Sequence, residues 1–157
     1  KNALIFANSN EHTERGYTTS VSKPTVLMID KRFRKTPHIK EAMTKREPIK
    51  VYGSSEPDIT LVGWGSTKGP VLEAIETLET EGISARFVQV RVMEPFPENL
   101  GEYLKGDVVL FENNRSAELG TLIKLNTGYV FKHIGLRYDG RPFDPNEIVT
   151  KVKEVLA

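Results

Sequence analysis

A glycine-rich turn is the first stretch of the chain whose residue types could do chemistry. Gly63, Gly65 and Gly69 lie between a short apolar run and a pattern with helical periodicity. Backbone amides at the start of a helix can receive an anion, and this turn adds hydroxyl and ammonium groups beside them. The candidate anion contacts are Gly65, Ser66, Thr67 and Lys68. The competing interpretation is that the glycines only allow the strand and the helix to pack closely.

The spacing of these glycines does not fit the two common nucleotide-binding loops. A dinucleotide fingerprint, G-x-G-x-x-G, would place its third glycine one residue before Gly69. The next apolar run ends without the acidic residue that would bind a ribose hydroxyl. Lys68 precedes the last glycine, whereas the lysine of a Walker loop follows it. A Rossmann-type or P-loop nucleotide site is therefore disfavoured.

A second polar cluster follows the apolar run at 107–111. It consists of Glu112, Asn113 and Asn114. If that run is a central strand, these residues stand at its carboxyl end, which is where open α/β sheets bind ligands. They are candidates for contact with a substrate, a cofactor or a neighbouring domain. The alternative is a plain connecting loop, because every strand end needs one.

Other catalytic and metal-binding patterns are missing from the sequence. His12, His38 and His133 lie far apart, and none has a second ligand at metal-binding spacing. The chain has no Cys, so it cannot supply thiolates to zinc or to an iron–sulfur cluster. No nucleophile elbow is present. We therefore expect no catalytic and no metal-ligating residue in this chain.

Strand and helix patterns alternate from residue 49 onward. The predicted strands cover 49–52 (an edge strand or simply extended chain), 59–62, 85–92, 107–112 and 129–135. The intervening helices end near Gly82 and Gly128, and a short helix is expected before Gly106. A final helix opens with Asp144 at N-cap, and its apolar stripe is Ile148, Val152, Val155 and Leu156. This alternation predicts a parallel or mostly parallel sheet with helices on both faces.

The first 48 residues differ from the rest of the chain. They show short helical patterns that are interrupted at Pro37 and end at Pro48. A basic cluster at 31–35 favours a solvated helix face over a phosphate or acidic-partner site. We therefore predict an irregular and helical connector over 1–48 and a compact α/β domain over 49–157.

Composition limits the partners and the compartment. The chain of 157 residues has 22 Lys and Arg against 21 Asp and Glu, so its near-neutral charge gives no reason to expect nucleic acid or a membrane as partner. No apolar run is long enough to span a membrane, and no signal-peptide pattern is present, so a cytoplasmic location is expected. Because the first residue is Lys1 rather than Met, the chain is expected to be a fragment of a longer subunit.

Several short motifs occur together, and in order, in a known family. They are Asn10-Glu11-His12-Thr13-Glu14-Arg15-Gly16, Lys31-Arg32-Phe33-Arg34-Lys35, Leu61-Val62-Gly63-Trp64-Gly65-Ser66-Thr67-Lys68-Gly69, Glu94-Pro95-Phe96-Pro97, Phe111-Glu112-Asn113-Asn114 and Tyr138-Asp139-Gly140-Arg141-Pro142-Phe143. Over nearly its whole length, the chain resembles the C-terminal part of the α subunit of 2-oxoacid:ferredoxin oxidoreductases.

The resemblance implies a fold and an activity. The fold would be a transketolase C-terminal-like α/β domain, a three-layer α/β/α sandwich with a mainly parallel (mixed) sheet of about five strands. The complete enzymes decarboxylate a 2-oxoacid oxidatively with thiamine diphosphate and Mg²⁺. They pass electrons through an iron–sulfur cluster to ferredoxin and form acyl-coenzyme A.

In such an enzyme this chain would be a structural, accessory domain. It would pack on the thiamine-binding domains of its own subunit, beside a β subunit with thiamine and iron–sulfur sites. None of the cofactors would be held by this fragment alone. The alternatives are the C-terminal domain of another thiamine-dependent dehydrogenase or transketolase, and a free-standing anion- or nucleotide-binding module.

Overall fold

The computed structural model describes residues 9–157, and the chain divides into two compact units, 1–42 and 43–157. In the first unit, His12 and Thr18 form an isolated antiparallel bridge, and helix α1 covers Ser22–Phe33. The side chain of Arg32 donates hydrogen bonds to the carboxylate of Glu11. This hydrogen bond lowers the pKa of Glu11 to about 2. One member of the basic cluster therefore pairs within its own unit.

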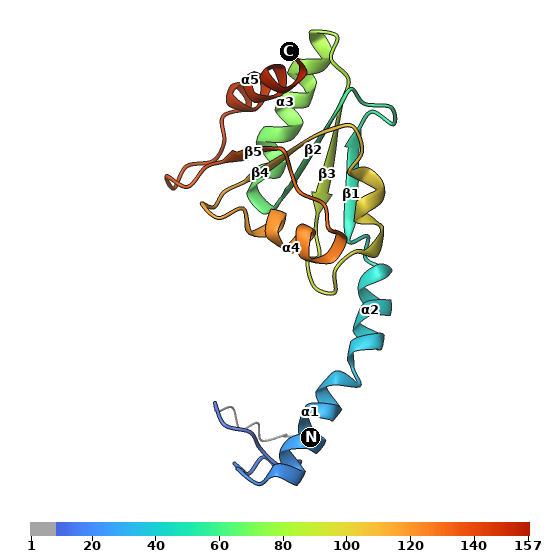
Figure 1. Cartoon of the computed structure of the whole chain (residues 1–157), viewed down its shortest axis with the longest axis vertical. Helices are drawn as coiled ribbons and strands as arrows, with labels where there is room; N and C mark the ends of the chain where they lie inside the picture. The colour runs from blue at the N-terminus through green and yellow to red at the C-terminus, as the bar shows by residue number, and fades with distance from the viewer. Residues whose placement is uncertain (1–8) are drawn as a thin grey trace, which may run out of the picture. The chain divides into compact units, whose positions relative to one another are not determined.

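The second unit is an α/β sandwich in which helices cover a five-stranded sheet (Figure 1). Helix α2 (Thr36–Thr44) leads into it across the boundary between the units. Its strands are β1 (Ile49–Gly53), β2 (Ile59–Trp64), β3 (Ala85–Val90), β4 (Asp107–Glu112) and β5 (His133–Leu136). Its helices are α3 (Lys68–Thr80), α4 (Glu118–Thr127) and α5 (Pro145–Leu156), with 3₁₀ turns η1 (Gly65–Thr67) and η2 (Glu98–Tyr103).

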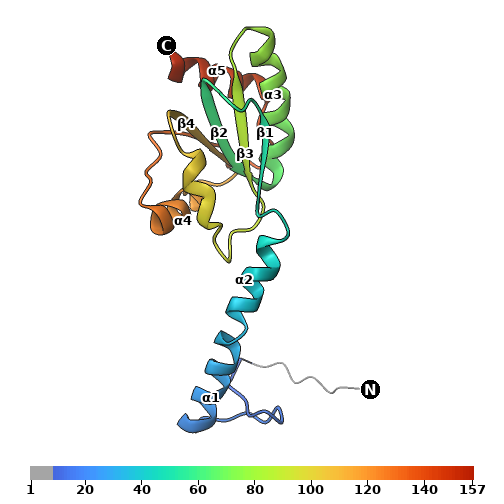
Figure 2. The ribbon, with the colours of Figure 1, turned by 90° about the vertical axis from the view of Figure 1, so that its right-hand side faces the viewer.

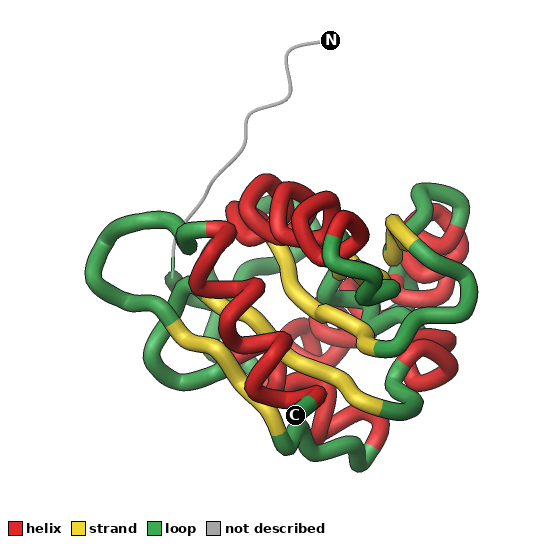
Figure 3. The backbone as a smooth tube through the Cα atoms, turned by 90° about the horizontal axis from the view of Figure 1, so that it is seen from above, coloured by secondary structure: helices red, strands yellow, loops and turns green. Residues whose placement is uncertain are grey.

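The five strands form one mixed sheet in the order β1-β3-β2-β4-β5. Only the edge strand β1 is antiparallel, to β3, and the other pairs are parallel. Figure 2 shows α3 on one side of the sheet and α4 on the other, and Figure 3 traces the strands between the helices. The predicted three-layer architecture with a mainly parallel sheet is confirmed. The edge strand over 49–53 settles the question of whether that segment is a strand or merely extended chain.

Each face of the sheet has its own apolar core. Under α3 and α5, the core includes Leu61, Phe87 and Ile148. Under α4 and η2, it includes Val62, Leu100 and Ile123. Leu61 and Val62 are adjacent in β2 and point to opposite faces, as strand geometry requires, and both are fully buried. This is why the central strands are almost wholly apolar.

Local sequence signals explain where α3 and α5 begin and end. Gly82 has φ +82°, and the bonds from its amide to the Glu79 carbonyl and from the Ile83 amide to the Leu78 carbonyl form a Schellman motif. Asp144 and Glu147 form the predicted capping box at the start of α5. These predictions are confirmed.

Several local predictions were inaccurate. The strand predicted over 85–92 ends at Val90, and the strand predicted over 59–62 continues to Trp64. Strand β5 begins at His133, because Tyr129 and Phe131 form an edge-to-face pair that packs into the α4-side core instead of pairing with β4. The short helix before Gly106 is the 3₁₀ turn η2. In α5, Val149 is buried, whereas Leu156 is 37% exposed in the last turn.

Replacing Asp144 with alanine tests the α5 cap. The Asp144 side chain accepts a hydrogen bond from the Asn146 amide at 2.8 Å, and without it that amide loses its partner. We expect the free energy of unfolding to fall by about 1 kcal/mol, measured by urea denaturation. Thr150→Ala, on the exposed face of the same helix, should change it by less than about half as much. Equal losses in both variants would contradict a capping role.

Candidate functional site

The carboxyl ends of the parallel strands meet at one edge of the sheet. Gly63 of β2 is paired with Phe111 of β4, and Glu112 is paired with Leu136 of β5. The residues that follow these strands therefore lie side by side. This edge is where open α/β sheets bind ligands.

Glu112 lies at this edge, but its carboxylate points into the protein and is fully buried. It accepts hydrogen bonds from the indole Nε1 of Trp64 at 3.1 Å and from Nδ2 of Asn114 at 2.7 Å. It also accepts from the backbone amides of Leu119 at 2.9 Å and Gly120 at 3.0 Å. Four donors on one side chain are what an ionised carboxylate can satisfy.

These bonds make Glu112 the cap of α4. The residue before that helix is Ala117, which has φ +51° and no side-chain cap, so the first amides of α4 need acceptors from elsewhere. Asn114 serves the amide of Glu118 at 3.4 Å, and Glu112 serves the next two. The negative charge of Glu112 also suits the positive end of the helix dipole.

The residues of the glycine turn have different roles. Gly63 packs tightly, since a Cβ there would lie 2.5 Å from Oγ1 of Thr67. The Thr67 hydroxyl is buried and donates to the Trp64 carbonyl at 2.9 Å. The Lys68 ammonium lies 5.3 Å from the ring centre of Tyr52 in β1, within cation–π range. Gly65 has φ +56°, which favours glycine at this turn.

Ser66 joins the two sequence-predicted clusters. Its hydroxyl donates to Oδ1 of Asn113 at 3.2 Å, and both residues are exposed. The structure thus brings Ser66 and Asn113 together at the surface. Thr67 and Glu112, in contrast, have side chains directed into the protein.

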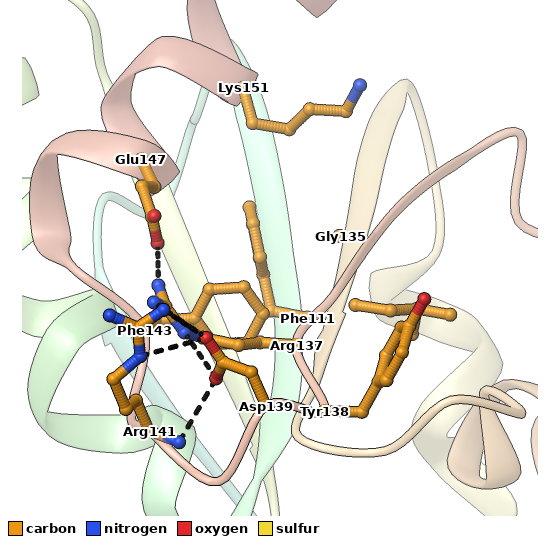
Figure 4. A pocket seen from close by; sticks show the side chains of 10 residues that line it. Phe111, Gly135, Arg137, Tyr138, Asp139, Arg141, Phe143, Glu147 and Lys151 are labelled. Carbon is orange, nitrogen blue, oxygen red and sulfur yellow. Dashed lines mark hydrogen bonds and ion pairs between the residues drawn. The ribbon is translucent and has the colours of Figure 1, made fainter.

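Sequence reasoning missed the loop after β5 as part of the site. There, Arg137 donates to both carboxylate oxygens of Asp139, at 3.2 and 3.4 Å, and pairs with Glu147 of α5. Nε of Arg141 donates to the same Asp139 at 2.9 Å, so one carboxylate bridges two arginines (Figure 4). In the sequence, the Asp-Gly pair at 139–140 is typical of a turn, and the stretch 138–141 was otherwise noted only as part of a family motif. Its position after a parallel strand, at the same edge as Asn113, was the available signal.

Arg137 and Arg141 both line two hollows. The aromatic-floored hollow, of about 520 Å³, is lined by Phe111, Gly135, Leu136, Arg137, Tyr138, Asp139, Arg141, Phe143, Glu147 and Lys151 (Figure 4). The polar hollow, of about 500 Å³, is lined by Ser66, Asn113, Arg137, Tyr138, Gly140, Arg141 and Pro142. Two of the sequence-predicted residues, Ser66 and Asn113, line the polar hollow.

The arginine pair should remain intact in mild acid. Hydrogen bonds from Arg141 and then Arg137 hold the pKa of Asp139 below its usual range. A depressed pKa contributes stability above the unfolded value of 3.8, which is lost as the pH falls through the folded pKa. We expect the NMR titration of the Asp139 carboxyl to begin only below pH 3.8, and to move upward in Arg141→Gln. An unchanged titration in that variant would contradict the assigned cause.

The part of the chain that the structure describes has neither a metal-binding group of side chains nor a membrane-spanning helix. In residues 9–157, no three His, Asp or Glu side chains are grouped closely enough to hold a metal ion. Over the same range, no helix is both long and apolar enough to cross a membrane. The carboxyl edge is lined by polar side chains, two arginines and aromatic side chains.

Comparison with known proteins gives informative matches to a family, to a curated relative and to two solved structures. The family described as "Transketolase, C-terminal domain" matches residues 50–121. The α subunit of 2-oxoacid:ferredoxin oxidoreductase 2 from Aeropyrum pernix is 38% identical over 98% of this chain and 24% of its own length. The solved 2-oxoglutarate:ferredoxin oxidoreductase of Magnetococcus marinus, with 2-oxoglutarate, coenzyme A and succinyl-CoA bound, is 29% identical and superposes with a TM-score of 0.75. That match covers 99% of this chain and 27% of the other.

A second solved structure is matched over almost its own whole length. It is the α chain of a probable 2-oxoacid ferredoxin oxidoreductase from Thermoplasma acidophilum. It is 40% identical, with a TM-score of 0.52, over 70% of this chain and 97% of that one. In contrast, the chain spans about a quarter of the length of the curated relatives it matches.

The sheet order and the two helical layers give residues 43–157 a transketolase C-terminal-like fold, and the family match lies within this unit. The chain belongs to the family of the α subunits of 2-oxoacid:ferredoxin oxidoreductases.

Proposed function

We propose that this chain is part of the α subunit of an enzyme that carries out the coenzyme A-dependent oxidative decarboxylation of a 2-oxoacid with ferredoxin as electron acceptor. In that enzyme the chain is an accessory domain that packs on the thiamine-binding domains. The observation that carries the proposal is the match of almost the entire chain to a quarter of each α-subunit relative. The domain's own chemistry is consistent with this role, since its carboxyl edge offers hydrogen-bond donors and two arginines.

The cofactors of such an enzyme do not fit the residues of this chain. An iron–sulfur cluster is held by cysteines, and the chain has none. The Mg²⁺ that accompanies thiamine diphosphate takes oxygen ligands, and residues 9–157 contain no group of three acidic or histidine side chains that could hold a metal ion. We therefore place thiamine diphosphate, Mg²⁺ and the cluster elsewhere in the complete enzyme. Coenzyme A would also bind there, with any contact from this chain limited to the carboxyl edge.

The proposed partners are the remaining domains of the same subunit, a β subunit with thiamine and iron–sulfur sites, and ferredoxin for the whole complex. The first unit supports this assignment. Helix α1 leaves Val26, Leu27 and Phe33 between 55% and 72% exposed, which is unusual for a helix that has no partner. We propose that residues 1–48 act as a connector whose apolar side chains pack on the rest of the subunit.

The expected location is cytoplasmic, with no nucleic acid and no membrane as partner.

The carboxyl edge is the proposed contact region of the α/β domain. Asn113 and Ser66 are exposed there and can meet a substrate or a neighbouring domain directly. Glu112 and Asn114 act through the positions they give to Trp64 and α4. The anion contact predicted for Gly65, Ser66, Thr67 and Lys68 is retained as a secondary role of the same edge.

The DNA sequence upstream of the codon for Lys1 tests the proposal. We expect it to continue the reading frame into a thiamine-pyrimidine-type domain. A stop codon or an unrelated domain immediately upstream would contradict the assignment to an α subunit. It would favour a free-standing module with the same fold.

A further inference from the structure

The polar hollow at the carboxyl edge is lined mainly by side chains that can donate hydrogen bonds. It lies where the β2 and β4 ends meet the loop after β5, and its lining includes two arginines, a tyrosine, an asparagine and a serine. Among the described residues, 9–157, no aspartate or glutamate lines it. The wall therefore offers hydrogen-bond donors without a carboxylate that would repel an anion.

The two arginines are held in place by carboxylates that do not line the polar hollow. Asp139 lines the aromatic-floored hollow but not the polar one, and it accepts hydrogen bonds from Arg137 and Arg141. Arg137 is anchored further by Glu147 of α5, and its side chain is only 16% exposed. The backbone amide of Arg137 donates to the Glu112 carbonyl at 3.0 Å, which fixes the start of the loop to β4.

Arg141 and Tyr138 also keep donors that are not used within the described residues. The Nε and Nη2 atoms of Arg141 donate to Asp139, whereas its Nη1 has no partner within residues 9–157, and the side chain is 73% exposed. The hydroxyl of Tyr138, a residue that is 65% exposed, likewise has no partner in that range. A guanidinium with a free edge fits the oxygens of a carboxylate or a phosphate.

We propose that the polar hollow binds the phosphate or carboxylate group of a small molecule. Arg141 would supply the charged donor, and Tyr138, Asn113 and Ser66 the neutral groups around it. The volume of about 500 Å³ lies in the range of small-molecule sites. This inference does not depend on the proposed function, because it rests on the lining of the hollow alone.

The direction of the donors, more than net charge, makes the site. Arg137, Arg141, Asp139 and Glu147 together carry no net charge, so long-range attraction contributes little. Binding then depends on the geometry that Asp139 imposes on the two arginines. Of the four residues first predicted to contact an anion, only Ser66 lines this hollow.

An NMR titration of the whole ¹⁵N-labelled chain with inorganic phosphate, and separately with succinate, tests the proposal. We expect saturable shifts at Ser66, Asn113 and Gly140, and the ligand that binds more tightly identifies the class. Arg141→Gln should weaken binding at least about tenfold, the loss of one charge-assisted hydrogen bond. Tyr138→Phe should weaken it less. Arg91→Gln, which removes a surface arginine paired with Glu47 at 3.3 Å, should leave it unchanged.

Asp139→Asn separates an organised site from mere positive charge. The variant adds one net positive charge but removes the bridge, so an organised site binds the anion more weakly and a simple charge patch binds it more tightly. Tighter binding in Asp139→Asn, non-saturating shifts, or equal losses in Arg141→Gln and Arg91→Gln would each overturn the proposal.

Discussion

Replacing Glu112 with alanine should lower the free energy of unfolding by at least about 3 kcal/mol. The carboxylate is fully buried and accepts from two side chains and two backbone amides. Each buried donor left without a partner costs about 1–3 kcal/mol. Urea denaturation followed by fluorescence measures the change, because Trp64 is the only tryptophan of the chain and lies in the same network.

Two further variants distinguish the loss of the Glu112 hydrogen bonds from the effect of removing any glutamate side chain. Glu112→Gln keeps the shape but turns an amide N–H₂ toward N–H donors, so we expect a loss of about 2 kcal/mol and an indole that iodide quenches more easily. Glu73→Ala removes an exposed carboxylate from α3 and should change the stability by less than about 0.5 kcal/mol. Unchanged quenching of Trp64 in both Glu112 variants would contradict the hydrogen bond to its indole.

Gly63→Ala should lower the free energy of unfolding by about 2–3 kcal/mol. A methyl group there would lie 2.5 Å from Oγ1 of Thr67 and 3.1 Å from the backbone oxygen of Phe111 in β4. Neither can move cheaply, since Thr67 is hydrogen-bonded to the Trp64 carbonyl and Phe111 belongs to the paired strand. Urea denaturation measures the loss.

The same turn provides the matched control. Gly69 lies within α3, and a Cβ at that position would meet no atom within 4 Å. Gly69→Ala should therefore stabilise the chain by about 0.5–1 kcal/mol, because alanine restricts the unfolded backbone and favours the helix. The double variant Gly63→Ala with Thr67→Ala should recover part of the loss. A loss at Gly69 equal to that at Gly63 would show that the turn needs flexible residues rather than space.

Much of the fold could be predicted because its signals are local. The buried face of α3 follows from the spacing of Val71, Ile75 and Leu78, and its end follows from Gly82. The start of α5 follows from Asp144 and Glu147, whose side chains act within one turn. These features require no knowledge of distant parts of the chain. The start of β5 was misplaced because pairing with β4, rather than the apolar pattern at 129–132, decides where that strand begins.

The site was predictable only in position. Both polar clusters were expected at the carboxyl ends of strands, and the structure shows that Ser66 and Asn113 form a hydrogen bond there. The inward direction of Glu112 depends on α4, whose N-terminus has Ala117 where a capping side chain would normally be. That missing cap is visible in the sequence, but the residue that compensates for it is not adjacent. The bridge from Asp139 to Arg137 and Arg141 was missed because nothing in a turn sequence shows which hollow its charges border.

The most direct test of the accessory role uses the complete enzyme with the segment that matches residues 49–157 deleted from its α subunit. Size-exclusion chromatography would follow assembly with the β subunit, and 2-oxoacid-dependent ferredoxin reduction would follow activity. We expect assembly and activity to fall together, while the iron content of the proposed β subunit stays unchanged. Full activity and full assembly after the deletion would contradict the account.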